Sequence, residues 1–446
     1  MKHFFIAALS LVPMALSHAA DRSRPNVLIM VADDLGYGDV SCLSHGAVKT
    51  PNLDRLAKSG IKFTAGYVTA PLCAPSRAGF FTGLYQQRFG FLDNEGAIPT
   101  NLPLLPGVLR NAGYHTGLMG KWHSEGPAPH ERGCFDETLC SARPSPFLDY
   151  FDPKLSRNGK METHQGYISD VLAGEAEDFI ERNKTKPFSL TVTFNAPHIA
   201  KVVKPFHLIR KEYDAALAEG KIYDVPKSPT ARHGEVQKYS AQFPGDSARA
   251  DTVATITALD EAVGRILDKL HQTGLAKNTI VFFFGDNGAH PENRSDNGAL
   301  RDYKWSHFEG GIRVPFLAAY PGVFPAGLEY AKPVSTLDIF PTVASLTGTT
   351  PPSNLDGVNL TPFLNGEKSE SPHETLFFNT TKHGAIRQGQ WKLVMVPSGP
   401  SALFDLEKDA EEKHDLASAE PTRVKLLEES WQTWRAQMPP PAMKSK

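Results

Sequence analysis

The sequence predicts an α/β protein with a large sheet, mixed but mostly parallel, followed by a small C-terminal α+β subdomain with an antiparallel sheet. Two observations lead to this fold class. As far as residue 348, short apolar runs alternate with segments of helical periodicity, the pattern of β–α–β units with helices on both faces of a sheet. After residue 349 the chain is rich in turn residues, and it then carries four short strand patterns and one helix. We therefore expect one large domain at residues 21–369 and a smaller one at residues 370–446.

Each expected element has its own signal in the chain. Apolar runs predict buried strands at residues 26–32, 114–119, 188–194, 279–284 and 312–319. Apolar residues at helical spacing and closing glycines predict helices at residues 52–59, 102–111, 252–272 and 336–347. In the C-terminal part, strands are expected at residues 375–378, 384–387, 391–396 and 402–405, and a helix at residues 421–437. The charged, weakly periodic span 200–249 is expected to be a lid or a substrate-facing excursion.

The first twenty residues have the pattern of a secretory signal peptide. A basic start is followed by an apolar run from Phe4 to Leu16 and by small residues at Ala19 and Ala20. This pattern predicts an exported protein, periplasmic or secreted. The run is too short to span a bilayer and no later run is longer, so we expect no membrane span.

Charge and cysteine content exclude other classes of protein. The chain has 47 basic and 49 acidic residues, a net charge of −2, so no overall field favours nucleic acid as a partner. Four cysteines are too few to form the framework of an exported chain of 446 residues. Cys134 and Cys140 are close enough in sequence to pair, which would leave Cys42 alone, and the sequence leaves this pairing open.

The segment that begins at Cys73 predicts a helix with a reactive group at its tip. Pro75 suits the first helical turn, and Gly83 suits the end of the helix. A helix N-terminus attracts anions through unpaired N–H groups, and Arg77 adds a planar fork that matches a tetrahedral oxyanion. The alternative is an ordinary buried cysteine in front of a helix.

Polar residues follow the strongest strand patterns. They are Asp33 and Asp34, Lys121 and His123, His198, and Asp286 and Asn287. The carboxyl ends of strands line the ligand crevice of an open α/β sheet, so we expect these side chains to meet at one edge. The four oxygen-bearing residues suit Ca²⁺ or Mg²⁺ better than a softer metal. Taken singly, each residue has a commoner role: a cap or turn for the aspartates, a structural histidine, or a surface lysine for Lys121 and Lys304.

Taken together, these segments resemble the type I sulfatases, relatives of alkaline phosphatase, over nearly the whole chain after the leader. The resemblance is carried by the C-x-P-S-R motif at residues 73–77 and by residues 25–39, 113–123, 285–288 and 301–315. Residues 391–393 and 403–406 resemble the C-terminal subdomain of that family. The resemblance implies an alkaline phosphatase-like sandwich fold and hydrolysis of sulfate esters.

The resemblance also implies a nucleophile and a metal site. Cys73 would be oxidised by a formylglycine-generating maturation enzyme, and its aldehyde hydrate would attack sulfur and contact the metal. The other ligands of one Ca²⁺ ion would be Asp33, Asp34, Asp286 and Asn287. Loss of the second hydroxyl proton of the hydrate would then expel sulfate.

Five further residues would handle charge and protons in this scheme. Arg77 and Lys121 would stabilise the hydrate and the charge around it. Lys304 and His198 would hold the sulfate and assist the leaving oxygen. His123 would be the base that collapses the sulfated intermediate.

Other functions stay open at this level. The same superfamily fold hosts phosphoesterases and phosphonate hydrolases, and a non-catalytic sulfate- or glycan-binding protein is a third reading. For the substrate, an exported enzyme favours a sulfated polysaccharide or other carbohydrate over a small aryl or alkyl sulfate. Four basic residues of the span 200–249 are candidate contacts to uronates or further sulfates, or solvated surface: His207, Arg210, Arg232 and His233.

Overall fold

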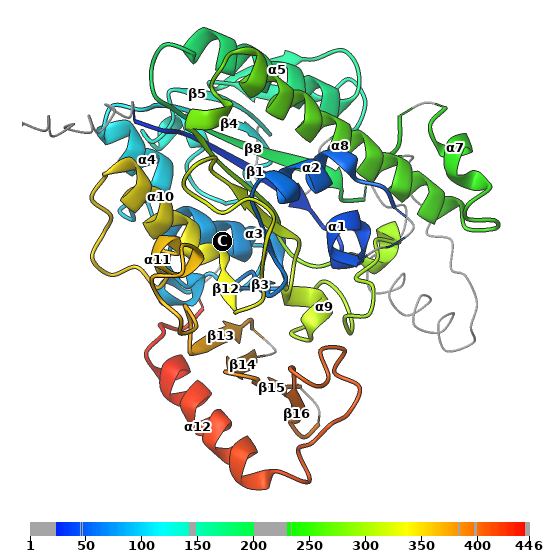
Figure 1. Ribbon diagram of the computed structural model, residues 1–446, viewed down its shortest axis with the longest axis vertical. Coiled ribbons are helices and arrows are strands. Elements are labelled where there is room, and N and C mark those ends of the chain that lie inside the picture. Colours follow the sequence, from blue (N-terminus) through cyan, green and yellow to red (C-terminus); the bar gives the residue numbers. More distant parts are fainter. Residues whose placement is uncertain are drawn as a thin grey trace, which may run out of the picture.

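The computed structural model describes residues 24–44, 46, 48–141, 149–199, 230–232, 234–381, 384–396 and 399–441. Within them, a ten-stranded sheet runs through the large domain in the order β11-β2-β10-β9-β1-β8-β4-β5-β6-β7 (Figure 1). The strands are β1 (Asn26–Asp33), β2 (Ile61–Phe63), β4 (His115–Gly120), β5 (Glu137–Cys140), β6 (Lys154–Arg157), β7 (Lys160–Thr163), β8 (Phe188–Pro197), β9 (Thr279–Gly285), β10 (Phe316–Ala319) and β11 (Leu328–Tyr330). A two-stranded pair, β3 (Gly66–Tyr67) with β12 (Val334–Ser335), lies beside it. The four strands β9-β1-β8-β4 are parallel neighbours, and β5 continues the parallel run, so the predicted mixed, mostly parallel sheet is confirmed.

Helices cover both faces of this sheet (Figure 1). On one face lie α2 (Pro51–Ser59), α5 (Ile168–Asn183) and α8 (Ser247–Gln272), and on the other α3 (Cys73–Thr82), α4 (Leu105–Asn111) and α10 (Ile339–Thr347). Alternate residues of β1 point to the two layers: Leu28 and Met30 pack in the first core, and Val27 and Ile29 in the second. The shorter helices are α1 (Ser41–Ser44), α7 (Val236–Ser240), α9 (Glu309–Ile312) and α11 (Thr361–Leu364).

The C-terminal subdomain is an antiparallel sheet with one long helix, drawn orange to red in Figure 1. Its strands are β13 (Thr375–Asn379), β14 (Gly384–Gln388), β15 (Trp391–Met395) and β16 (Ala402–Asp405), and its helix is α12 (Pro421–Ala436). Ile386 and Leu393 pack under Leu427 of α12. On the other side, Phe378 and Phe404 share a core with Tyr67 of β3, so the sheet is seated on the large domain. The domain boundary near residue 370 stays a prediction.

One expectation from the sequence was wrong, and the structure answers one question that the sequence left open. Residues 312–319 do not form one strand, because Glu309–Ile312 is a helical turn and β10 starts only at Phe316, after Pro315. Cys134 and Cys140 are both free thiols. Cys134 packs in the core beside α4, whereas Cys140 is the last residue of β5.

The predicted lid is only partly described. His207, Arg210 and His233 lie outside the described residues, as does the leader at residues 1–20. Arg232 is held by carboxylates: it donates to Asp170 Oδ1 at 2.6 Å and to Glu261. Among the helices of the described chain, none is long and apolar enough to pass through a bilayer.

Candidate active site

The carboxyl ends of four adjacent parallel strands bring the predicted residues together. In sheet order they carry Asp286 and Asn287 after β9, Asp33 and Asp34 at β1, His198 after β8, and Lys121 with His123 after β4. All seven side chains are buried. Two further elements reach the same place, namely the N-terminus of α3 with Cys73 and the loop before α9 with Lys304.

Asp34 is the centre of the site. Its φ is +62°, a left-handed conformation that turns the chain sharply at the end of β1. The Lys304 ammonium donates to both carboxylate oxygens, at 2.8 and 3.0 Å, and Asn287 Nδ2 donates to Oδ1 at 2.7 Å. Burial opposes ionisation, but the charge of Lys304, with a smaller contribution from Lys121, holds the pKa of Asp34 well below its ordinary value. These contacts therefore favour the ionised form of Asp34.

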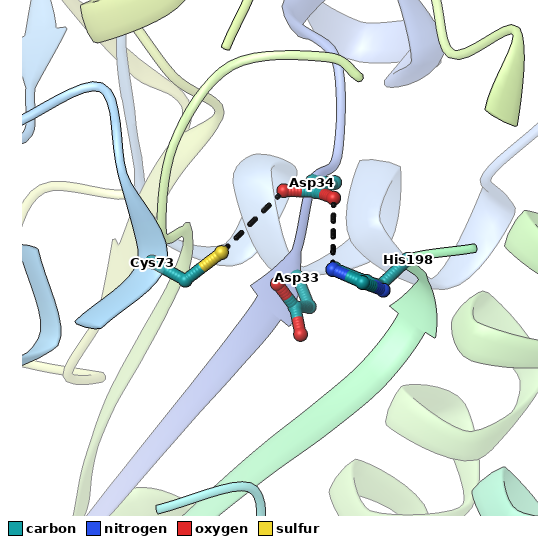
Figure 2. A group of neighbouring side chains, drawn as sticks. All are labelled: Asp33, Asp34, Cys73 and His198. Atoms are coloured by element: carbon teal, nitrogen blue, oxygen red, sulfur yellow. Dashed lines mark hydrogen bonds and ion pairs between the residues drawn. The ribbon is translucent and has the colours of Figure 1, made fainter. Parts of the chain in front are cut away.

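Cys73 is the first residue of α3, as predicted, with Pro75 in the first turn and Gly83 in a left-handed conformation at the end. Its thiol lies 3.8 Å from Asp34 Oδ1 (Figure 2). Burial raises the pKa of the Cys73 thiol well above its ordinary value, so an unmodified Cys73 would be a neutral, poorly nucleophilic thiol.

Three cations balance three carboxylates in the site. Arg77 donates to Asp286 Oδ2 from Nε at 2.9 Å and pairs with it through Nη2 at 2.8 Å, and Lys121 Nζ donates to Asp33 Oδ2 at 2.6 Å. Together with the pair between Lys304 and Asp34, these contacts make the site close to neutral. A bound divalent cation would therefore make it positive, which suits an anionic substrate.

Two histidines face the site in their neutral form. Burial and the charges of Lys121 and Arg77 hold the pKa of His123 well below its ordinary value, and its buried Nδ1 has no hydrogen-bond partner in the described structure. Burial also lowers the pKa of His198 to about 3, although Asp34 acts in the opposite direction. His198 Nδ1 bonds the Ile199 carbonyl at 2.8 Å, so its proton is on Nδ1, and Nε2 lies 3.5 Å from Asp34 Oδ2.

The donor set fits a hard divalent cation. Ligand atoms of Asp33, Asp34, Cys73 and His198 all lie within 4.8 Å of one another (Figure 2). Two buried acceptors, Asp33 Oδ1 and Asn287 Oδ1, have no hydrogen-bond partner in the described structure, as expected of oxygens arranged for a cation. Burial and the neighbouring Asp33 raise the pKa of Asp286, a repulsion that a cation would relieve. His198 belongs to this cluster, although the sequence predicted it at the sulfate.

Residues 25–349 match the family model described as Sulfatase, which covers more than half of the chain. The chain belongs to the sulfatase family. A second model, N-sulphoglucosamine sulphohydrolase, C-terminal, matches residues 300–435 of this sulfatase. The predicted type I sulfatase family is confirmed, and with it the enzyme class: the protein hydrolyses sulfuric esters.

Individual relatives agree along nearly the full length of this sulfatase. Arylsulfatase A of Bos taurus is 31% identical, over 89% of this chain and 84% of the relative. N-acetylgalactosamine-6-sulfatase of Mus musculus is 31% identical, over 86% of this chain and 74% of its own. The crystal structure of Ps i-CgsB in complex with k-i-k-neocarrahexaose superposes with a TM-score of 0.82 at 30% identity, covering 95% of both chains. These neighbours confirm the predicted alkaline phosphatase-like fold.

Two residues beside the site of this sulfatase, Tyr150 and Asn293, had no signal in the sequence. The hydroxyl of buried Tyr150 donates to the His198 carbonyl at 2.6 Å and lies 3.2 Å from the Asn195 carbonyl. Asn293 Nδ2 donates to the Pro197 carbonyl at 2.7 Å. These contacts hold the turn that carries His198, and because they go to backbone carbonyls no side-chain motif marks them.

Proposed function

We propose that this sulfatase cleaves sulfate esters of carbohydrates outside the cytoplasm, with a formylglycine formed from Cys73 and one Ca²⁺ ion. The observation that carries the proposal is the position of Cys73. It opens a ten-residue helix, its thiol lies 3.8 Å from Asp34 Oδ1, and it belongs to a buried cluster with Asp33 and His198 whose ligand atoms lie within 4.8 Å of one another. Burying three carboxylates and three cations around a neutral thiol would cost free energy without a functional reason.

The ligand residues proposed for the cation are Asp33, Asp34, Asp286 and Asn287, with position 73 as the fifth. Their oxygens are hard donors, which Ca²⁺ prefers. When both groups are present, formylglycine supplies a hydrated aldehyde as nucleophile, and Ca²⁺ supplies positive charge for the sulfate oxygens.

The surrounding cations would orient the substrate and neutralise its charge. Lys304 reaches Asp34 from the loop before α9, and its ammonium would hold a sulfate oxygen. Lys121 and Arg77 are fixed by Asp33 and Asp286 and would stabilise charge near position 73. Because these groups are buried and already oriented, little reorganisation accompanies the reaction.

The histidines would move the protons. His123 is neutral, so its free Nδ1 can take the proton whose loss releases sulfate. His198 keeps its proton on Nδ1, and assisting the leaving oxygen requires a second proton on Nε2. The negative charge of a bound sulfate would favour that second proton.

Two features support a sulfated carbohydrate outside the cytoplasm as the substrate. One solved relative, Ps i-CgsB, was determined in complex with k-i-k-neocarrahexaose and is 30% identical over 95% of this chain. The leader pattern at residues 1–20 favours export to the periplasm or medium. Activation would require a formylglycine-generating enzyme as a partner during maturation, and the catalytic domain would comprise residues 21–369.

The proposal is tested with protein made in a host that forms formylglycine. Replacing Cys73 by Ala should abolish hydrolysis, whereas Cys134→Ala, which changes another buried thiol, should keep it. Chelation followed by Ca²⁺ should remove and restore activity. A panel of defined sulfated saccharides is compared with nitrophenyl sulfate, and faster turnover of the aryl ester than of every saccharide would contradict the carbohydrate assignment.

A further inference from the structure

The loop that carries Lys304 is strained and needs support. This Lys304 loop, residues 298–308, has no regular helix or strand before α9 begins. Two of its residues other than glycine, Asp302 and Trp305, have positive φ angles of +64° and +75°. Such conformations persist only where surrounding contacts fix them. The position of the Lys304 ammonium therefore depends on what holds this loop.

The loop is closed at its base by the start of α9. Gly310 N donates to the Arg301 carbonyl at 2.8 Å, and Gly311 N to the Phe308 carbonyl at 2.9 Å. A side chain at Gly310 would place its Cβ 2.1 Å from the Asp302 carbonyl oxygen, so only glycine fits between helix and loop. A displacement of the start of α9 would therefore also displace the Lys304 loop.

The start of α9 is held by the C-terminal subdomain. Glu309, the first residue of α9, is fully buried, and its Oε1 accepts from Lys392 Nζ of β15 at 2.8 Å. The same ammonium lies 2.8 Å from Glu412 Oε1, in the segment after β16. Glu412 Oε2 in turn accepts from the backbone N–H of Glu309 at 2.6 Å. Tyr67 of the large domain donates to Glu309 Oε2 at 2.7 Å.

A second contact reaches the other end of the loop. Arg301 Nη1 donates to the Glu412 carbonyl at 2.8 Å, and its guanidinium lies over the Phe308 ring at 3.9 Å. Glu412 itself has a φ of +55°, which a non-glycine residue adopts only at a cost. The side chain of Glu412 thus contacts the residue that follows the Lys304 loop, Glu309, and its carbonyl contacts Arg301 near the start of the loop.

The buried network of Lys392, Glu309 and Glu412 is better explained by positioning of the loop than by stabilisation of the fold alone. Burial, opposed by the charge of Lys392, raises the pKa of Glu412 above its ordinary value. Desolvating an ammonium and two carboxylates is expensive, and apolar residues of the same volume often stabilise a fold as well. A fully paired buried network does, however, enforce a single geometry.

We propose that the C-terminal sheet fixes the Lys304 loop through Lys392 and Glu412, which makes them positioning residues for sulfate ester hydrolysis. This inference rests on the proposed role of Lys304 in holding the sulfate. It gives the C-terminal subdomain an indirect part in the reaction, because Lys392 and Glu412 contact Glu309 at the base of the loop and act through Lys304.

A double-mutant cycle on nitrophenyl sulfate tests the proposal. Glu412→Ala should lower kcat/KM by about tenfold or more, since it frees the loop. Glu412→Gln keeps an acceptor for the Glu309 N–H and should restore kcat/KM to within about threefold of the wild-type value. In a Lys304→Ala background, Glu412→Ala should change kcat/KM by less than about twofold, because both act through one side chain.

The control is His373→Asn, which removes another buried contact between the C-terminal segment and the large domain, the 2.8 Å pair with Asp338. It should lower the thermal unfolding temperature and leave kcat/KM as in the wild type. If Glu412→Ala fails to fold, the same cycle is run with Arg301→Met, which removes the hydrogen bond to the Glu412 carbonyl and the cation–π contacts with Phe308 and Phe404.

The outcomes distinguish the proposed role of Lys304 from the proposed positioning by Glu412. If Lys304→Ala leaves kcat/KM unchanged, the proposed role of Lys304 is wrong. If Lys304→Ala is impaired but Glu412→Ala keeps the wild-type kcat/KM, or if the two effects multiply, the role of Lys304 stands and the positioning by Glu412 is refuted.

Discussion

The Tyr150 hydroxyl provides the sharpest single-atom test of how His198 is held. Tyr150→Phe removes the donor to the His198 carbonyl at 2.6 Å and leaves the ring in the core, so no cavity forms. Two buried carbonyls, those of His198 and Asn195, lose a polar neighbour. The expected loss in free energy of unfolding is about 1–3 kcal/mol, the cost of leaving buried groups without a partner.

The effect on turnover follows from the contacts that remain. A displacement of a catalytic group by about 1 Å can cost about 100-fold in rate. After the change, Asn293 still donates to the Pro197 carbonyl, and His198 Nδ1 still bonds Ile199. We therefore expect a smaller displacement and a fall in kcat of about tenfold.

The assay compares kcat, KM and chemical denaturation of Tyr150→Phe with those of Tyr167→Phe. Tyr167 is a matched control because its ring centroid lies 5.8 Å from that of Tyr150 and its hydroxyl donates to the Thr230 carbonyl at 2.8 Å, away from His198. Both variants should lose stability, and only Tyr150→Phe should lose kcat. Equal kcat values for the two variants would refute the reasoning.

Three further predictions concern the frame around the site. Gly288→Ala should lower both stability, by about 1–3 kcal/mol or more, and activity, because its Cβ would lie 1.7 Å from the Gly310 carbonyl oxygen; unchanged thermal unfolding would contradict this. His373 pairs with Asp338, which raises its pKa against the effect of burial, so its stabilisation is complete below about pH 6.5 and is lost as the pH rises through the raised value. The difference in unfolding free energy between wild type and His373→Asn should therefore be larger at acid than at alkaline pH, and a difference that grows with pH would be the wrong sign. Since Cys134 and Cys140 are free, a reducing agent should leave the unfolding temperature unchanged, whereas a clear decrease would reveal a disulfide.

The central part of the fold and the site could be predicted because their signals are local. Each strand of the β9-β1-β8-β4 block is an apolar run that ends in polar residues, and parallel pairing brings those ends together without further information. Cys73 and Pro75 likewise mark the start of α3 by their own chemistry. Periodicity and residue type suffice for such elements.

Features that depend on distant partners could not be predicted in this way. Lys392 lies in an apolar strand pattern, and nothing near it shows that it pairs with Glu309, 83 positions away. Tyr150 bonds only backbone carbonyls, which leave no trace in the side chains of their segment. The expected strand at residues 312–319 was wrong at its start, where Ile312 ends α9 and Pro315 precedes β10, and the contact of Glu412 with the first residue of α9 left no local signal.

The mass of the tryptic peptide that spans residues 63–77 tests the central proposal most directly. In protein from a host that forms formylglycine, we predict the mass in which an aldehyde replaces the CH₂–SH group of Cys73, and its share of the peptide should rise in proportion to kcat across preparations. A fully active preparation in which this peptide carries only the intact thiol would contradict the account.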